Sequence, residues 1–257
     1  MRRAGRITAV RITTRRLGSL GVVMTLAMVV RSAGAQPAIV PPWRAPSEPI
    51  VMVGIGLEPA VVVTARYLHY LAGSDEHTGG FVGGGLSVPT TVFSRGAWRA
   101  DLLAAAFRVR PDGWAVGGQA ATFVARNSNE AGRMVGVGVA VRATAGKRGS
   151  QSYWGIDLGW QGTLATHIRH SPFARATFAD RYPPGVAGDS LPRDGWYRLP
   201  AQRYRAGVLL ARRIGEHGGG IQLALGTTFV PQKQGQLIAF DLGQLPFYLE
   251  PVVRVPW

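Results

Sequence analysis

Tyr153 to Leu164 reads YWGIDLGWQGTL, and its residues fall into two faces that alternate at every second position. The even-numbered positions are apolar or glycine: Trp154, Ile156, Leu158, Trp160, Gly162 and Leu164. The odd-numbered positions between them hold Tyr, Gly, Asp, Gly, Gln and Thr. Successive side chains of a β-strand point to opposite sides of a sheet. The stretch is therefore expected to be a strand with one apolar and one polar face.

The same alternation returns along the chain. It is clean in two more stretches, Met134 to Ala143 and Gly220 to Val230. It is weaker in Trp98 to Arg110, Trp114 to Ala125, Gln202 to Arg213 and Ala60 to Leu71. After residue 35 no run reaches the roughly 18 apolar residues that a membrane-spanning helix needs. If these strands enter a membrane, they must form a closed barrel, because the lipid interior offers no hydrogen-bond partner to the backbone N–H and C=O groups at an open sheet edge. We therefore predict an all-β fold, an antiparallel up-and-down transmembrane β-barrel.

The C-terminal stretch FYLEPVVRVPW alternates to the last residue. Its apolar positions include Phe247, Leu249, Val253, Val255 and Trp257. This resembles the final strand of small bacterial outer-membrane β-barrel proteins of the Gram-negative type, which ends on an aromatic residue. The resemblance implies that these residues are the signal read by the barrel-assembly machinery, with outer-membrane lipid and lipopolysaccharide as further partners. Pro251 and Pro256 depart from the pattern, since proline has no backbone N–H to donate to a neighbouring strand.

The N-terminal part is typical of an exported protein. Seven Arg precede or flank an uncharged run, LGSLGVVMTLAMVV, and Ala33-Gly34-Ala35 follows it. This is the order of a cleaved signal peptide, so we predict a signal peptide over 1–35 with cleavage after Ala35, a Pro-rich linker over 36–49 and a barrel over 50–257. The pair Arg15-Arg16 also resembles a twin-arginine signal, which would export a folded protein and favours a soluble periplasmic ligand-binding β-barrel.

The lengths of the links between strands predict the strand number. In barrels of this kind short periplasmic turns alternate with longer external loops. Counting back from the last strand, the external links are 231–245, 165–201, 126–133 and 72–97, and each is longer than the periplasmic links 214–219, 145–151 and 111–113. The order favours eight strands. Two further segments, Ile50 to Leu57 and Gly80 to Phe93, would make ten.

The positive charge does not point to nucleic acid. The chain carries 29 Lys+Arg and 14 Asp+Glu, and removing the seven Arg of 1–35 lowers the net charge from +15 to +8. The remaining Arg are spread through Gly-rich and apolar segments and form no single stripe or known binding motif. The chain has no Cys, which excludes disulfides and thiolate sites.

Charged residues on the polar strand faces are expected to line the lumen. They are Arg99, Asp101, Arg142, Asp157, Arg203, Arg205, Glu250 and Arg254. An eight-stranded barrel leaves room inside only for side chains, and buried charges must be compensated. We therefore predict a paired structural network, a filled polar lumen and no cofactor or metal.

The long segment 165–201 is expected to be an external loop. Five of its arginines could bind lipopolysaccharide phosphates or an outside partner: Arg169, Arg175, Arg181, Arg193 and Arg198. These features favour a non-enzymatic structural, adhesive or small-solute role.

The alternative is an outer-membrane lipid esterase or deacylase that uses the region from His167 to Ser171. Such enzymes place His and Ser two residues apart on one strand face, whereas His170 and Ser171 are adjacent. A loop could still bring them together, with Asp180, Asp189 or Asp194 to orient the imidazole.

Overall fold

The computed structural model describes residues 37–43, 49–57, 61–90, 96–129, 132–177, 194–198, 202–215, 219–229 and 247–256. Its elements are β1 (Ile50–Leu57), β2 (Val61–Tyr70), β3 (Thr78–Pro89), β4 (Trp98–Val109), β5 (Trp114–Asn129), β6 (Gly132–Arg148), β7 (Ser152–His170), α2 (Pro172–Thr177), β8 (Gly195–Tyr197), β9 (Gln202–Ile214), β10 (Gly219–Phe229) and β11 (Phe247–Pro256).

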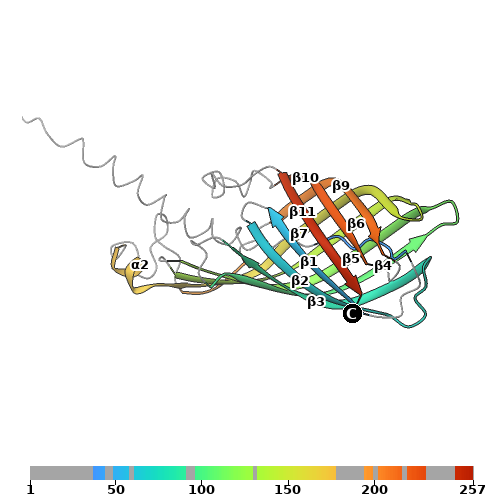
Figure 1. Ribbon diagram of the computed structural model, residues 1–257. Coiled ribbons are helices and arrows are strands. Elements are labelled where there is room, and N and C mark those ends of the chain that lie inside the picture. Colours follow the sequence, from blue (N-terminus) through green and yellow to red (C-terminus); the bar gives the residue numbers. More distant parts are fainter. Residues whose placement is uncertain are drawn as a thin grey trace, which may run out of the picture.

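The described strands close into an antiparallel barrel (Figure 1). β1 to β7 pair in chain order, and β7, β9, β10 and β11 continue the sheet. β11 pairs with β1, with Ile50 opposite Pro256, so the last strand lies beside the first. Ten strands form the wall. β8 is not one of them and pairs with the last part of β7, from Thr166 to Ile168. The prediction of an all-β antiparallel barrel is confirmed.

The preferred number of eight strands was wrong, and the alternative of ten describes the barrel. The two added strands are β1 and β3, which correspond to the segments Ile50 to Leu57 and Gly80 to Phe93 of that alternative. In β1 the inward positions are Ile50, Met52 and two glycines, so neither face is polar. In β3 a Cβ at Gly83 would lie 2.1 Å from the carbonyl oxygen of Tyr67, and one at Gly85 would lie 2.7 Å from Cγ of Arg66. Close packing leaves room only for glycine at these positions. Because glycine has no side chain, apolar and polar residues do not alternate there.

The lengths of the links do not separate the two ends of the barrel. At the terminal end, where β1 begins and β11 ends, the links are 71–77, 110–113, 149–151 and 215–218. At the opposite end, called the loop end below, they are 58–60, 90–97, 130–131, 171–201 and 230–246. The expected ordering fails because β5 and β6 extend until only residues 130–131 lie between them, and because β3 divides the segment 72–97. Because the added strands are a pair, β1 still begins and β11 still ends at the same end of the barrel.

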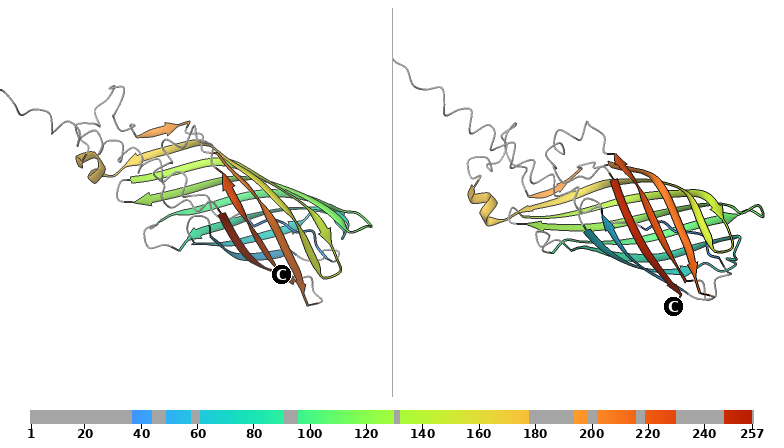
Figure 2. Two further views of the ribbon diagram at one scale, coloured as in Figure 1. Left: turned by 90° about the horizontal axis from the view of Figure 1, so that it is seen from above. Right: turned by 45° about the horizontal axis from the view of Figure 1, so that its top comes forward.

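The wall extends beyond the barrel at the loop end. β5, β6 and β7 are the longest strands, and β9 pairs with β7 only as far as Gly162. The remainder of β7 pairs with β6 and β8, and α2 follows at its tip (Figure 2). Val137 pairs with Ala165 and Gly138 with Thr163, so Leu164 forms a β-bulge where this extension begins. Bulges bend a strand and increase its twist.

Side chains sort by face around the barrel. Inward positions hold most of the buried charges and an apolar cluster that includes Leu68, Phe81, Phe107 and Leu209. Outward positions hold large apolar residues, for example Leu102 at 71% exposure, Ile156 at 52% and Val253 at 49%.

The Pro-rich stretch that was expected to be a linker is partly inside the barrel. Its residues 37–43 are all buried, and Ile39, Val40 and Trp43 belong to the apolar cluster of the lumen. The lumen is therefore filled by charged residues and also by an apolar layer that this segment completes.

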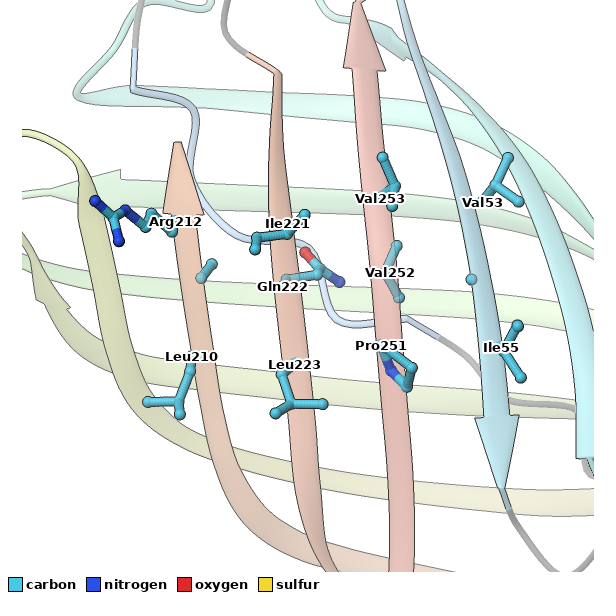
Figure 3. Close-up of a pocket in the computed structure, with 12 residues that line it drawn as sticks. Val53, Ile55, Leu210, Arg212, Ile221, Gln222, Leu223, Pro251, Val252 and Val253 are labelled. Carbon is cyan, nitrogen blue, oxygen red and sulfur yellow. The ribbon is translucent and has the colours of Figure 1, made fainter. Parts of the chain in front are cut away.

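The closing seam between β1 and β11 is interrupted. The two strands pair from Ile50 to Gly54 and again at Leu57, and the gap lies beside Pro251. Proline has no N–H to donate to the ladder. An open apolar groove lies on the outer wall beside this gap, lined by outward side chains of four strands (Figure 3). They include Val53, Ile55, Leu210, Ile221, Leu223 and Val253.

Candidate functional site: the barrel lumen

The charged residues predicted to line the lumen lie on the inward face. Arg99, Asp101, Arg142, Asp157, Arg203, Glu250 and Arg254 are buried, and Arg205 is half-buried. They come from five strands, β4, β6, β7, β9 and β11. Charges this deep in a barrel require partners, and the structure supplies most of them in two clusters.

The first cluster joins opposite parts of the wall. Arg142 donates from Nε to Asp157 Oδ1 at 2.6 Å and from Nη2 to Asp157 Oδ2 at 2.5 Å, which is a bidentate pair. Its third nitrogen, Nη1, donates to Glu250 Oε2 at 3.1 Å. Arg205 donates to Glu250 Oε1 at 2.5 Å, and Tyr248 donates to Asp157 Oδ2 at 2.7 Å. The guanidinium of Arg205 also lies 4.0 Å from the ring centre of Tyr248. β6, β7, β9 and β11 are thus held together through the lumen.

The second cluster centres on Asp101. Arg66 Nη2 donates to Asp101 Oδ2 at 3.0 Å, and Arg99 Nε lies 3.8 Å from the same oxygen. Arg99 also donates to Gln161 Oε1 at 2.7 Å and lies 4.0 Å above the ring of Phe123. Paired charges, hydrogen bonds and ring contacts together hold these side chains in one arrangement.

Arg66 is a charged lumen residue that the sequence pattern did not indicate. It is 2% exposed and lies on the inward face of β2 with Val62, Thr64 and Leu68. Valines at 61, 62 and 63 occupy both faces of the strand, so no alternation marked position 66 as inward. Its signal in the sequence was a lone Arg within a β-branched run, which is unfavourable unless the side chain faces a polar lumen.

Arg254 is bound in a different way from the other lumen arginines. Its Nη2 donates to the hydroxyl of Tyr70 at 2.6 Å, and its Nη1 donates to the carbonyl oxygen of Val40 at 3.1 Å. Within the described residues no carboxylate is paired with it. It therefore joins the wall to the segment inside the lumen.

The cluster around His170 lies on the extension at the loop end. Asp194 accepts hydrogen bonds from the backbone N–H of His170 at 2.8 Å, and its Oδ1 lies 2.9 Å from Nδ1 of the same residue. Arg175 of α2 also pairs with Asp194. Ser171 accepts a hydrogen bond from the N–H of Ala174 at 3.1 Å, as the N-cap of α2, with Pro172 at the first helical position. Asp194 thus orients His170, while the hydroxyl of Ser171 caps a helix.

The predicted loop arginines are only partly described. Arg169, Arg175 and Arg198 are exposed at the loop end, and Arg181 and Arg193 lie outside the described residues. In the predicted assembly signal, Phe247, Leu249, Val253 and Val255 all face outward on β11, and Trp257 lies outside the described residues.

In the described part of the chain, His, Asp and Glu residues form no group of three or more that could hold a metal ion. No helix in these ranges has the length and apolar character needed to cross a membrane. No protein family, curated protein or solved structure matches the chain. The function must therefore be inferred from the geometry of the barrel itself.

Proposed function

We propose that the chain is a non-enzymatic outer-membrane β-barrel protein with a closed lumen, which has a structural or adhesive role at the cell surface. The observation that carries this proposal is the inverted distribution of side chains. Buried Arg, Asp and Glu fill the interior, while Val, Leu and Ile face outward around a closed wall. Water does not stabilise such an exterior, whereas lipid does.

Aromatic and basic residues at the rims support a bilayer as the surroundings of this wall. Near the terminal end, Lys147 pairs with Trp114 on one side and Trp154 on the other, and all three are exposed. Near the loop end, Tyr204 pairs with Trp160 and its ring contacts Phe229. Trp and Tyr concentrate where hydrocarbon meets headgroups, and Lys and Arg favour anionic headgroups. Strands of about 9 to 11 residues are sufficient to cross a bilayer.

The closed lumen favours a surface role over a channel. The two charged clusters tie opposite strands together, and residues 37–43 fill the apolar layer near the terminal end. The part of the molecule that extends into solvent is the sheet at the loop end. This sheet and α2 at its tip expose Phe173 at 64% and Trp196 at 62%, together with Arg169 and Arg198. Aromatic and Arg side chains are typical of binding surfaces.

Fractionation tests this proposal. The full chain is expressed in a Gram-negative host, and its outer membranes are separated from periplasm and washed with carbonate. We expect the protein to stay with the outer membrane until detergent is added. Recovery in the periplasmic fraction without detergent would contradict the proposal and would favour the soluble ligand-binding barrel.

A further inference from the structure

Residues 37–43 are bound inside the barrel as a ligand would be. Ala38 is fully buried, Val40 is 2% exposed, and Ile39 and Trp43 are each 8% exposed. The segment joins no strand of the sheet. Side chains of the wall supply hydrogen bonds to it instead.

Five wall side chains donate hydrogen bonds to its backbone carbonyl groups. Arg66 donates to the oxygen of Pro37 at 3.3 Å, and Gln119 to the same oxygen at 3.4 Å. Gln222 donates to the oxygen of Ala38 at 2.8 Å. Arg254 donates to that of Val40 at 3.1 Å, and Arg148 to that of Pro42 at 2.5 Å. The donors come from β2, β5, β6, β10 and β11, so they surround the segment.

The composition of the segment matches these donors. It reads PAIVPPW, and its prolines at 37, 41 and 42 have no N–H. It therefore offers more carbonyl acceptors than N–H donors, while guanidinium groups are donors only. A buried backbone must have its polar groups satisfied, and here the Arg and Gln side chains do this in place of a β-ladder.

The apolar side chains and the glycines of the wall fit the segment as well. Ile39, Val40 and Trp43 share a cluster with Leu68, Phe81, Phe107 and others. A Cβ on Gly220 would lie 3.4 Å from the ring of Trp43, and one on Gly117 would lie 3.8 Å from the carbonyl oxygen of Ile39. The wall thus has small residues where the segment passes.

We propose that the lumen is a binding site for an extended, proline-rich peptide, and that residues 37–43 of the same chain occupy it as a plug. The recognised chemistry is a run of carbonyl oxygens with few N–H groups, ending in an aromatic side chain. The plug deepens the proposed function, because it closes the lumen near the terminal end. The binding itself requires a folded barrel and does not depend on the cellular location.

The first test supplies the segment as a separate peptide. A variant that lacks residues 36–43 is purified in detergent micelles, and a fluorescently labelled QPAIVPPW peptide is titrated into it by fluorescence anisotropy. We expect saturable binding to this variant, at least about tenfold weaker binding to the full chain whose site is occupied, and at least about tenfold weaker binding of a scrambled peptide. Equal binding of the two peptides, or no binding to a folded variant, would overturn the proposal.

Wall substitutions in the same background test the hydrogen bonds. Arg254→Met removes the donor to Val40 and is expected to weaken peptide binding by about tenfold or more, since hydrogen bonds to charged groups are the stronger ones. Arg108→Met is the matched control, because Arg108 is an exposed residue on the outward face of β4. Its effect on peptide binding should be less than about twofold. Equal effects of the two substitutions would contradict the assigned contacts.

A second measurement uses the full chain and does not require the shortened variant to fold. Because the chain has no Cys, a single introduced thiol reports its own accessibility. We expect Val40→Cys to react with a polar maleimide at least about a hundredfold more slowly than Ser150→Cys, whose site is exposed in the link 149–151, and to react fully after denaturation. Equal rates in the folded protein would overturn the plug. The location experiment above can fail independently of this one.

Discussion

Arg142 of β6 and Glu250 of β11 are 108 residues apart in the chain, and their side chains meet in the lumen at 3.1 Å. Glu250 also accepts from Arg205, and Arg142 also holds Asp157. The carboxylate of Glu250 thus links the last strand, β11, to β6 and β9. This link makes the closed form of the barrel depend on residues that the sequence places far apart.

Arg142→Met should strongly destabilise the barrel. It would leave Asp157 and Glu250 buried without their shared partner, and breaking a buried ion pair by removing one side costs about 3–5 kcal/mol. The measurement is urea unfolding in lipid vesicles, followed by the gel mobility of unheated samples. Arg133→Met, at an exposed outward position of the same strand, should change the free energy of unfolding by less than about 0.5 kcal/mol. Similar values for the two variants would show that the cluster contributes little.

Leu102→Arg tests whether lipid surrounds the wall. Leu102 is 71% exposed in the middle of β4, and Ile214 is 54% exposed at the last residue of β9. An Arg at the bilayer midplane costs about 2–4 kcal/mol, whereas one near the interface costs about 0–1 kcal/mol. We expect Leu102→Arg to show the larger cost in vesicle unfolding and Ile214→Arg the smaller. A water-exposed wall would give two small effects within about 0.5 kcal/mol.

Gly83→Ala should destabilise the barrel by overpacking. The new Cβ would lie 2.1 Å from the backbone oxygen of Tyr67, which cannot move without displacing β2. Forcing a methyl group into such a position costs about 1–3 kcal/mol. At Gly118 the nearest atom to a new Cβ is 3.9 Å away, so Gly118→Ala should be neutral or stabilise by up to about 1 kcal/mol. The same unfolding assay compares them, and equal losses would contradict this account of β3.

Asp75, in the link 71–77, should titrate at low pH. Its carboxylate accepts hydrogen bonds from the N–H groups of Thr78 at 2.6 Å and His77 at 2.7 Å, and these bonds lower the pKa of Asp75 below its usual value. A lowered folded pKa means that this carboxylate stabilises the turn fully above its unfolded pKa of about 3.9. The stabilisation is lost as the pH falls through the lower, folded value.

An NMR titration of the Asp75 carboxyl carbon measures this directly. We expect a midpoint below the usual Asp value in the folded protein, and a normal midpoint in a short peptide with the sequence of the link. Asp75→Asn keeps a side-chain acceptor and should remove the titration while retaining the turn. A midpoint at or above the usual value would contradict the hydrogen bonds.

The alternation of side chains predicted most of the wall because it depends on neighbouring residues only. All eight expected strands are present, and Tyr153 to Leu164 lies within β7 with Trp154, Ile156 and Leu158 facing outward. β1 and β3 were only an alternative because their inward positions, apart from Ser87 in β3, are apolar or glycine. Glycine at such positions depends on the neighbouring strand, as where the side chain of Arg66 in β2 lies over its cross-strand partner Gly85.

The plug could not be predicted from local sequence. Prolines at 37, 41 and 42 indicate only that the segment is neither helix nor inner strand. The groups that hold it, such as Gln222 and Arg254, lie 184 and 214 residues away from their partners. The inward charged faces were visible from the sequence, but the pairing between them, and the donors left for residues 37–43, follow only from the closed barrel.

Refolding with and without lipid tests the central claim most directly. Chain comprising residues 36–257 is diluted from urea into lipid vesicles or into lipid-free buffer, and unheated and heated samples are compared by gel electrophoresis. Because the outward wall is apolar and the charges are inside, we predict a band of shifted mobility that forms only with vesicles and is lost on heating. A stable, monomeric and fully folded barrel in lipid-free buffer would contradict the account.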